Sequence, residues 1–172
     1  MNKLTKVFLL VMVVALAGVG GYMIATRVGK QETSSTTGSS TSEVTGAGGA
    51  IADYSGKGLS VFPKEVLKKT NTTTLNLSNN NLTGALPAEI HDLKNLVSLD
   101  VSNNEMTGVP AEVGQLKKLK VLNYANNKLT GLPMELGNLT QLQTLDLSGN
   151  PNVSQTDLAK IKAKLTATTI KL

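Results

Sequence analysis

A repeat of 23 to 24 residues constrains the fold of this 172-residue chain more than any other feature. Two unrelated residue types follow this period. The asparagines are Asn80, Asn104, Asn127 and Asn150. The prolines are Pro63, Pro87, Pro110 and Pro133. Because a unit of this length cannot bury an apolar face by itself, the sequence predicts stacked turns that share one continuous core.

Apolar residues recur at fixed offsets around each of these asparagines, in the pattern LxxLxLxxNxL. One repeat reads Leu96, Leu99, Val101, Asn104 and Met106, and the next reads Leu119, Leu122, Tyr124, Asn127 and Leu129. On these motifs, residues 50–172 resemble a leucine-rich repeat (LRR) domain of about five repeats. The repeats look similar to the Ras-suppressor-like and plant-receptor-like kinds.

The resemblance implies an α/β solenoid. Its arc would carry a short parallel β-sheet on the concave face and 3₁₀ or helical connections on the convex face. Within a strand, alternate apolar residues point into the core. Pro110 and the acid two residues later, Glu112, suit the first turn of such a connection. We expect the buried asparagines to satisfy backbone groups, and the hydroxyl of Tyr124, at a leucine position, to reach a polar edge.

Residues 154–172 are predicted to cap the C-terminal end of the solenoid. Ser154 and Asp157 form a capping-box pattern, which indicates the start of a helix. One apolar face of that helix would consist of Leu158, Ile161 and Leu165. Residues 168–172 then alternate as a closing strand.

The N-terminal residues 1–30 are predicted to form a signal-anchor or transmembrane segment. Residues 7–25 carry no charge, and a helix of that length spans roughly 28 Å, close to the hydrocarbon core of a bilayer. The flanking charges are Lys3, Lys6, Arg27 and Lys30. The alternative is a signal peptide cleaved near Ala17, which would release a secreted soluble LRR effector. Both interpretations place the LRR domain on the extracytoplasmic side.

Two smaller features accompany this segment. Ala17, Gly21 and Ala25 have the small-residue spacing of close helix pairs, which predicts a possible weak homodimer. Residues 31–49 are rich in Ser, Thr and Gly and are predicted to be a disordered linker, because they offer little that could be buried.

Composition excludes several classes of function. The chain has no Cys, which excludes disulfides, thiolate metal sites and a cysteine nucleophile. It has one His, His91, with no identifiable nucleophile beside it. We therefore expect no enzymatic activity, no catalytic residues, no cofactor and no metal. Residues 50–172 contain thirteen Lys, ten acidic residues and no Arg, so we expect no nucleic-acid partner.

The strand positions that face the concave side are the candidate binding site, because the core does not need them. They are Asp53, Thr74, Asn76, Ser98, Asp100, Val121, Asn123, Thr144 and Asp146. The same register assigns Ser78, Ser102, Ala125 and Ser148 to this side. Acids in alternate strands would lie roughly 10 Å apart, too far to share a proton or an ion. The alternative interpretation of this row is an ordinary soluble surface.

The sequence thus predicts a membrane-anchored LRR protein acting as a protein–protein interaction module, for adhesion or as a signalling scaffold. Its partner would be a protein or a surface glycan on the concave face. That face lacks Trp, Tyr and Arg, the usual anchors of interfaces. We therefore expect weak binding, or binding strengthened by multivalency.

Overall fold

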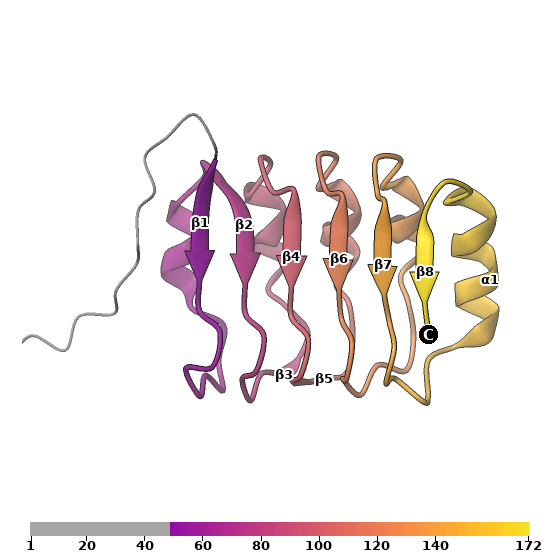
Figure 1. Ribbon diagram of the computed structural model, residues 1–172, viewed down its shortest axis with the longest axis horizontal. Coiled ribbons are helices and arrows are strands. Elements are labelled where there is room, and N and C mark those ends of the chain that lie inside the picture. Colours follow the sequence, from indigo (N-terminus) through magenta and orange to yellow (C-terminus); the bar gives the residue numbers. More distant parts are fainter. Residues whose placement is uncertain (1–48) are drawn as a thin grey trace, which may run out of the picture. The chain divides into compact units, whose positions relative to one another are not determined.

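The computed structural model describes residues 49–172, which form a solenoid around a six-stranded parallel sheet (Figure 1). The strands, in their order across the sheet, are β1 Ala50–Asp53, β2 Thr72–Asn76, β4 Ser98–Asp100, β6 Val121–Asn123, β7 Thr144–Asp146 and β8 Thr169–Lys171. Each repeat therefore adds one strand beside the previous one. The predicted parallel sheet is confirmed.

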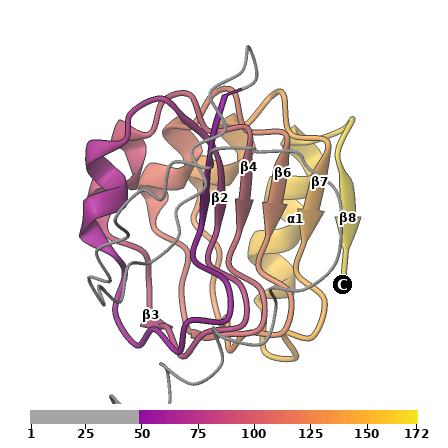
Figure 2. The same cartoon turned by 60° about the vertical axis from the view of Figure 1, so that its left-hand side comes forward.

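Four 3₁₀ helices connect successive strands. They are η2 Lys64–Lys68, η3 Ala88–Asp92, η4 Ala111–Gln115 and η5 Met134–Asn138. Each begins directly after one of the repeated prolines and carries a glutamate in its first turn, as the sequence predicts. These helices and α1 (Gln155–Lys164) lie on one side of the sheet, which is its far side in Figure 1 and is seen more from the edge in Figure 2. Within the described residues, the other face of the sheet stays open.

The core is a stack of the same aliphatic residue from successive repeats. Leu75, Leu99, Leu122 and Leu145 are in register across the sheet and fully buried. Burying one such side chain contributes about 1.5–3 kcal/mol. Each leucine packs against its counterparts in neighbouring turns. The stability of a repeat therefore depends on contacts with its neighbours more than on contacts within the repeat.

The repeated asparagines link each turn to the one before it. Asn104 Oδ1 accepts a hydrogen bond from the N–H of Leu82 at 2.9 Å, and its amide donates to the carbonyl oxygens of Leu77 and Val101, both at 3.0 Å. Asn80, Asn127 and Asn150 make the same kind of bonds. The predicted satisfaction of backbone groups by these asparagines is confirmed.

A second, two-stranded parallel sheet joins β3 (Thr83–Gly84) to β5 (Glu105–Met106) at the edge where the main strands end. The sequence does not predict this small sheet, since two residues are too few to show alternation. Nor does it predict the left-handed backbone of Asn79, Asn103 and Asn126, whose φ angles are 57°, 54° and 55°. Asparagine tolerates this conformation better than most residues.

The C-terminal end is closed by α1 and β8. The hydroxyl oxygen of Ser154 accepts a hydrogen bond from the N–H of Asp157 at 3.2 Å, which caps α1. Leu158, Ile161 and Leu165 are buried against the core. The predicted capping helix and closing strand both form.

The expectation for Tyr124 is wrong. Its side chain is fully buried, and its hydroxyl has no hydrogen-bond partner within the described residues. A ring at a leucine position points into the aliphatic stack, so its longer side chain extends deeper instead of reaching an edge. Burial strongly raises the pKa of the Tyr124 hydroxyl, so it is neutral at physiological pH.

The predicted transmembrane segment and its small-residue face lie outside the described residues, as does the predicted linker except for Gly49. Between residues 49 and 172, no helix has the length and apolar character needed to cross a membrane.

Candidate binding face

The open face of the sheet carries two rows of outward side chains, which we call the sheet face. The first row runs across the strands as Ile51, Thr74, Ser98, Val121, Thr144 and Thr169. The central row runs as Asp53, Asn76, Asp100, Asn123, Asp146 and Lys171. All nine residues that the sequence singles out lie in these two rows.

Three members of the rows, at the two ends of the sheet, are not among the residues predicted from the sequence. Ile51 begins the first row and is 49% exposed, while Val121 in the same row is 37% exposed. Thr169 and Lys171 belong to β8. The alternating pattern of residues 168–172, which predicts the closing strand, already indicates that Thr169 and Lys171 point to the same side. The first repeat is abbreviated, and a register shift between Ala50 and Ile51 hides the position of Ile51.

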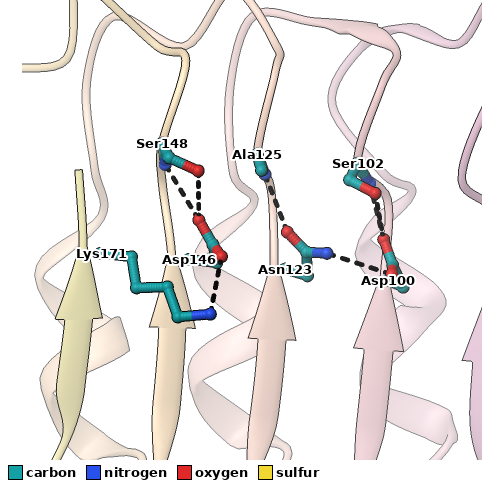
Figure 3. A network of polar contacts seen from close by, with 7 residues as sticks. All are labelled: Asp100, Ser102, Asn123, Ala125, Asp146, Ser148 and Lys171. Carbon is teal, nitrogen blue, oxygen red and sulfur yellow. Dashed lines mark hydrogen bonds and ion pairs between the residues drawn. The ribbon is translucent and has the colours of Figure 1, made fainter.

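The carboxylate of Asp100 is held by bonds within its own turn and by the neighbouring strand (Figure 3). Its Oδ1 accepts hydrogen bonds from the N–H of Ser102 at 2.8 Å and from its hydroxyl at 2.7 Å. Its Oδ2 accepts a bond from the side-chain amide of Asn123 at 3.1 Å. The acid–amide alternation therefore produces a hydrogen bond between adjacent strands.

Asp146 has the same local bonds and a cation beside it. Its Oδ1 accepts bonds from the N–H of Ser148 at 3.1 Å and from its hydroxyl at 2.6 Å. Lys171 Nζ lies 3.4 Å from Asp146 Oδ2 (Figure 3). Burial alone would raise the pKa of Asp146, but the bonds from Ser148 and the charge of Lys171 outweigh it and lower that pKa.

Asp53, the third aspartate of the central row, lies at the other end of that row. Its Oδ1 accepts bonds from the N–H and the hydroxyl of Ser55, at 3.0 and 2.8 Å. These two bonds lower the pKa of Asp53, and the nearby charge of Lys57 adds to the effect. An aspartate followed two residues later by a serine thus forms a closed turn at the ends of β1, β4 and β7.

These bonds fix the carboxylates of the central row in place. Asp100 is bonded to an amide and Asp146 is paired with a lysine, so both carboxylates are held in fixed orientations. With three aspartates and one lysine, the central row is polar and ordered and keeps a net negative charge. Among residues 49–172 there is no group of three or more His, Asp or Glu residues placed to hold a metal ion.

The strand-end residues that the sequence also assigns to this side are mostly shielded from solvent. Ser78, Ser102 and Ala125 are buried and Ser148 is half-buried. The hydroxyls of Ser102 and Ser148 bond the carboxylates of Asp100 and Asp146, so these two serines support the central row from beside it.

Stacked turns with one strand each, 3₁₀ connections and a ladder of buried asparagines define a parallel solenoid of short repeats. A family model described as a leucine-rich repeat region matches residues 66–167. The chain therefore belongs to the leucine-rich repeat family. No curated protein matches it significantly.

Several solved structures are similar. An LRR protein of Leptospira interrogans, LIC12759, is 42% identical with a TM-score of 0.61, over 66% of this chain and 28% of that one. The plant peptide hormone receptor RGFR1, in complex with RGF2, is 30% identical with a TM-score of 0.55, over 64% and 22%. The BIR3–SERK2 complex of Arabidopsis thaliana is 33% identical with a TM-score of 0.51, over 58% and 55%. The chain thus spans less than a third of the length of the first two.

Proposed function

We propose that this chain is a membrane-anchored LRR protein whose sheet face binds a protein partner on the extracytoplasmic side. The observation that carries the proposal is the open sheet face itself. Two rows of outward side chains run in register across six parallel strands. Repeat proteins use such continuous surfaces for binding. The similar structures RGFR1 with RGF2 and BIR3 with SERK2 are themselves complexes, which supports a protein or peptide as the partner.

The chemistry of the two rows indicates how such a partner would be held. Thr74, Ser98 and Thr144 offer hydroxyls, and Asn76 offers an amide, so the rows can donate and accept hydrogen bonds. Ile51 and Val121 add exposed aliphatic contacts. Because Asp100 and Asp146 are already held by their neighbours, their side chains need little further ordering on binding. The rows contain no aromatic residue or Arg to act as an anchor, so each single contact is weak.

Anchoring is the second part of the proposal and rests on residues 7–25. Attachment to a membrane would place many copies on one surface, where multivalency strengthens weak binding. Sequencing the N-terminus of the mature protein tests this part. An intact N-terminus agrees with the anchor, whereas a new N-terminus at Gly18 would favour the secreted alternative.

Capture by crosslinking at the native cell surface tests the binding part. The full chain is compared with the Asp100→Lys/Asp146→Lys variant. The matched control is Glu112→Lys/Glu135→Lys, which makes the same change of charge on the helical side. We expect the sheet-face variant to lose the captured partner and the control to keep it. Equal capture by both variants would show that the sheet face is not the binding site.

A further inference from the structure

Five lysines gather at one edge of the solenoid, away from the sheet face. They lie in the connections that lead from η2, η3 and η4 into the next strands. We call them the lysine edge, and they are Lys69, Lys94, Lys117, Lys118 and Lys120. Because all strands of the sheet are parallel, these connections lie together where the strands begin, at the top of Figure 1.

Hydrogen bonds between repeats show that these connections are adjacent. The amide of Asn95 donates to the carbonyl oxygen of Thr70 at 3.0 Å, and Lys118 Nζ donates to Asn95 Oδ1 at 2.8 Å. The N–H of Lys120 bonds the carbonyl oxygen of Val97 at 2.8 Å. The lysine edge therefore forms one continuous surface over three repeats.

The charge of this edge is not balanced locally. Residues 69–71, 93–97, 116–120, 139–143 and 165–168 contain no acidic residue. The ion pairs found within residues 49–172 involve none of the five lysines. Outside the lysine edge, the domain has eight lysines and ten acidic residues. The excess of positive charge in the domain is therefore concentrated at this edge.

A purely structural role explains only part of this cluster. Lys117 Nζ donates to the carbonyl oxygens of Gly114 and Asn138, at 2.8 and 3.2 Å, which satisfies carbonyl groups at the ends of both η4 and η5. Lys94 and Lys120, by contrast, are exposed. Like charges held close together are unfavourable unless something anionic neutralises them.

The position of β1 indicates what that anionic partner is. β1 begins at Ala50 and runs parallel to the other strands, so the chain enters the domain from residue 49 at the lysine edge. We propose that the lysine edge lies against anionic lipid headgroups of the membrane in which residues 7–25 are anchored. This inference rests on the anchoring part of the proposed function. With that edge on the membrane, the sheet face stands upright and remains accessible.

The size of the expected effect follows from the charge of an anionic membrane surface. Each lysine near such a surface favours the docked state roughly fivefold. Reversing two of them lowers the ratio of docked to undocked domain by about 25-fold or more. The attraction weakens with added salt, because salt screens exposed charges.

A fluorescent label on the full chain measures docking. Since the chain has no native cysteine, Thr140→Cys places one label at the lysine edge, in the connection between η5 and β7. Thr130→Cys places one at the opposite edge, in the repeat position of Thr83 and Thr107. Both threonines are exposed. The labelled chains are reconstituted into phosphatidylcholine vesicles with or without phosphatidylglycerol, with a quencher attached to lipid headgroups.

With phosphatidylglycerol present, we expect stronger quenching at position 140 than at position 130. Lys94→Glu/Lys120→Glu should abolish the difference, while Lys160→Glu/Lys162→Glu, with the same change of net charge on exposed parts of α1, should preserve it. Circular dichroism checks that both variants keep the fold. Equal quenching at the two positions, or a difference that persists without anionic lipid or in the lysine-edge variant, would overturn the proposal.

Extracting the chain from vesicles without anionic lipid tests the membrane anchor separately from the lysine edge. A chain that alkaline carbonate releases is not anchored by residues 7–25. The lysine edge is then tested by sedimentation of the free chain with vesicles. Binding that requires phosphatidylglycerol and disappears in Lys94→Glu/Lys120→Glu supports the lysine edge, and no binding overturns it.

Discussion

The side-chain oxygen of Asn104 accepts a hydrogen bond from the backbone N–H of Leu82 at 2.9 Å, and this bond ties one turn of the solenoid to the turn before it. The amide of Asn104 meanwhile bonds three carbonyl oxygens, those of Leu77, Val101 and Ser102. All of these groups lie in or beside the core, where water cannot replace a missing partner.

Asn104→Ala should therefore be strongly destabilising. It leaves a buried N–H and buried carbonyl oxygens unpaired, and we expect the free energy of unfolding to fall by about 3 kcal/mol or more. Urea unfolding followed by circular dichroism measures it. Asn103→Gly is the control, because Asn103 is exposed with φ of 54° and glycine adopts this conformation readily. If Asn104→Ala lowered the free energy of unfolding no more than the control does, the buried asparagines would not have the stabilising role given to them here.

Tyr124→Phe should increase stability. The substitution removes a buried hydroxyl that has no hydrogen-bond partner among residues 49–172 and leaves the ring in place, so we expect a gain of about 1–2 kcal/mol. Tyr54→Phe is the comparison, because the Tyr54 hydroxyl interacts with Glu65, and here we expect no gain. A loss of stability in Tyr124→Phe would mean that its hydroxyl is bonded in solution.

Gly114→Ala should disrupt the packing of η4 on η5. A Cβ atom at Gly114 would overlap the backbone carbonyl of Glu135, and backbone atoms of a neighbouring turn cannot move aside without shifting that turn. We expect a loss of about 1–3 kcal/mol. At Gly108 the nearest atom to a new Cβ is Ala85 Cβ at 3.9 Å, so Gly108→Ala should be neutral or slightly stabilising. Thermal melts of the two variants, run side by side, distinguish these outcomes.

Acid should weaken the fold in part through Asp146. Its pKa is lowered in the folded state, so its contribution to stability is present above about pH 3.8, its ordinary pKa, and is lost as the pH falls through the folded value. Asp146→Asn should be less stable than the parent chain at pH 7, with a difference that shrinks below pH 3.8. Urea midpoints against pH check this. An unchanged difference at low pH would mean that the ionised carboxylate contributes nothing.

Much of this fold could be predicted from the repeat, because a solenoid contact recurs at every period. Leu99 and Asn104 each have counterparts in the neighbouring turns, so one pattern indicates the strand, the core and the ladder together. Tyr124 shows the limit of this reasoning. The repeat period predicts the position of Tyr124. Whether its hydroxyl finds a hydrogen-bond partner depends on the particular atoms around this longer side chain.

The candidate site was predictable to a similar degree. Strand alternation places Asn76 and Asp100 in one outward row, as the structure does. Alternation does not show which oxygen of Asp100 is bonded, nor that Ser102 donates both of its bonds to that oxygen. Lys171 was harder to assign, since it belongs to a strand outside the LRR pattern that follows the capping helix. The lysine edge consists of residues in the connections. The repeat pattern specifies only the leucines there, so it does not predict the lysines.

The most direct test of the sheet face as a binding surface is site-specific photocrosslinking at the native cell surface. One photoreactive residue replaces Val121, in the first row of the sheet face, and another replaces Gln115, at the exposed end of η4. The account predicts that Val121 crosslinks to a discrete protein, that Gln115 does not, and that Asp100→Lys/Asp146→Lys abolishes the product. Crosslinking of the same protein through Gln115 and not through Val121 would contradict it.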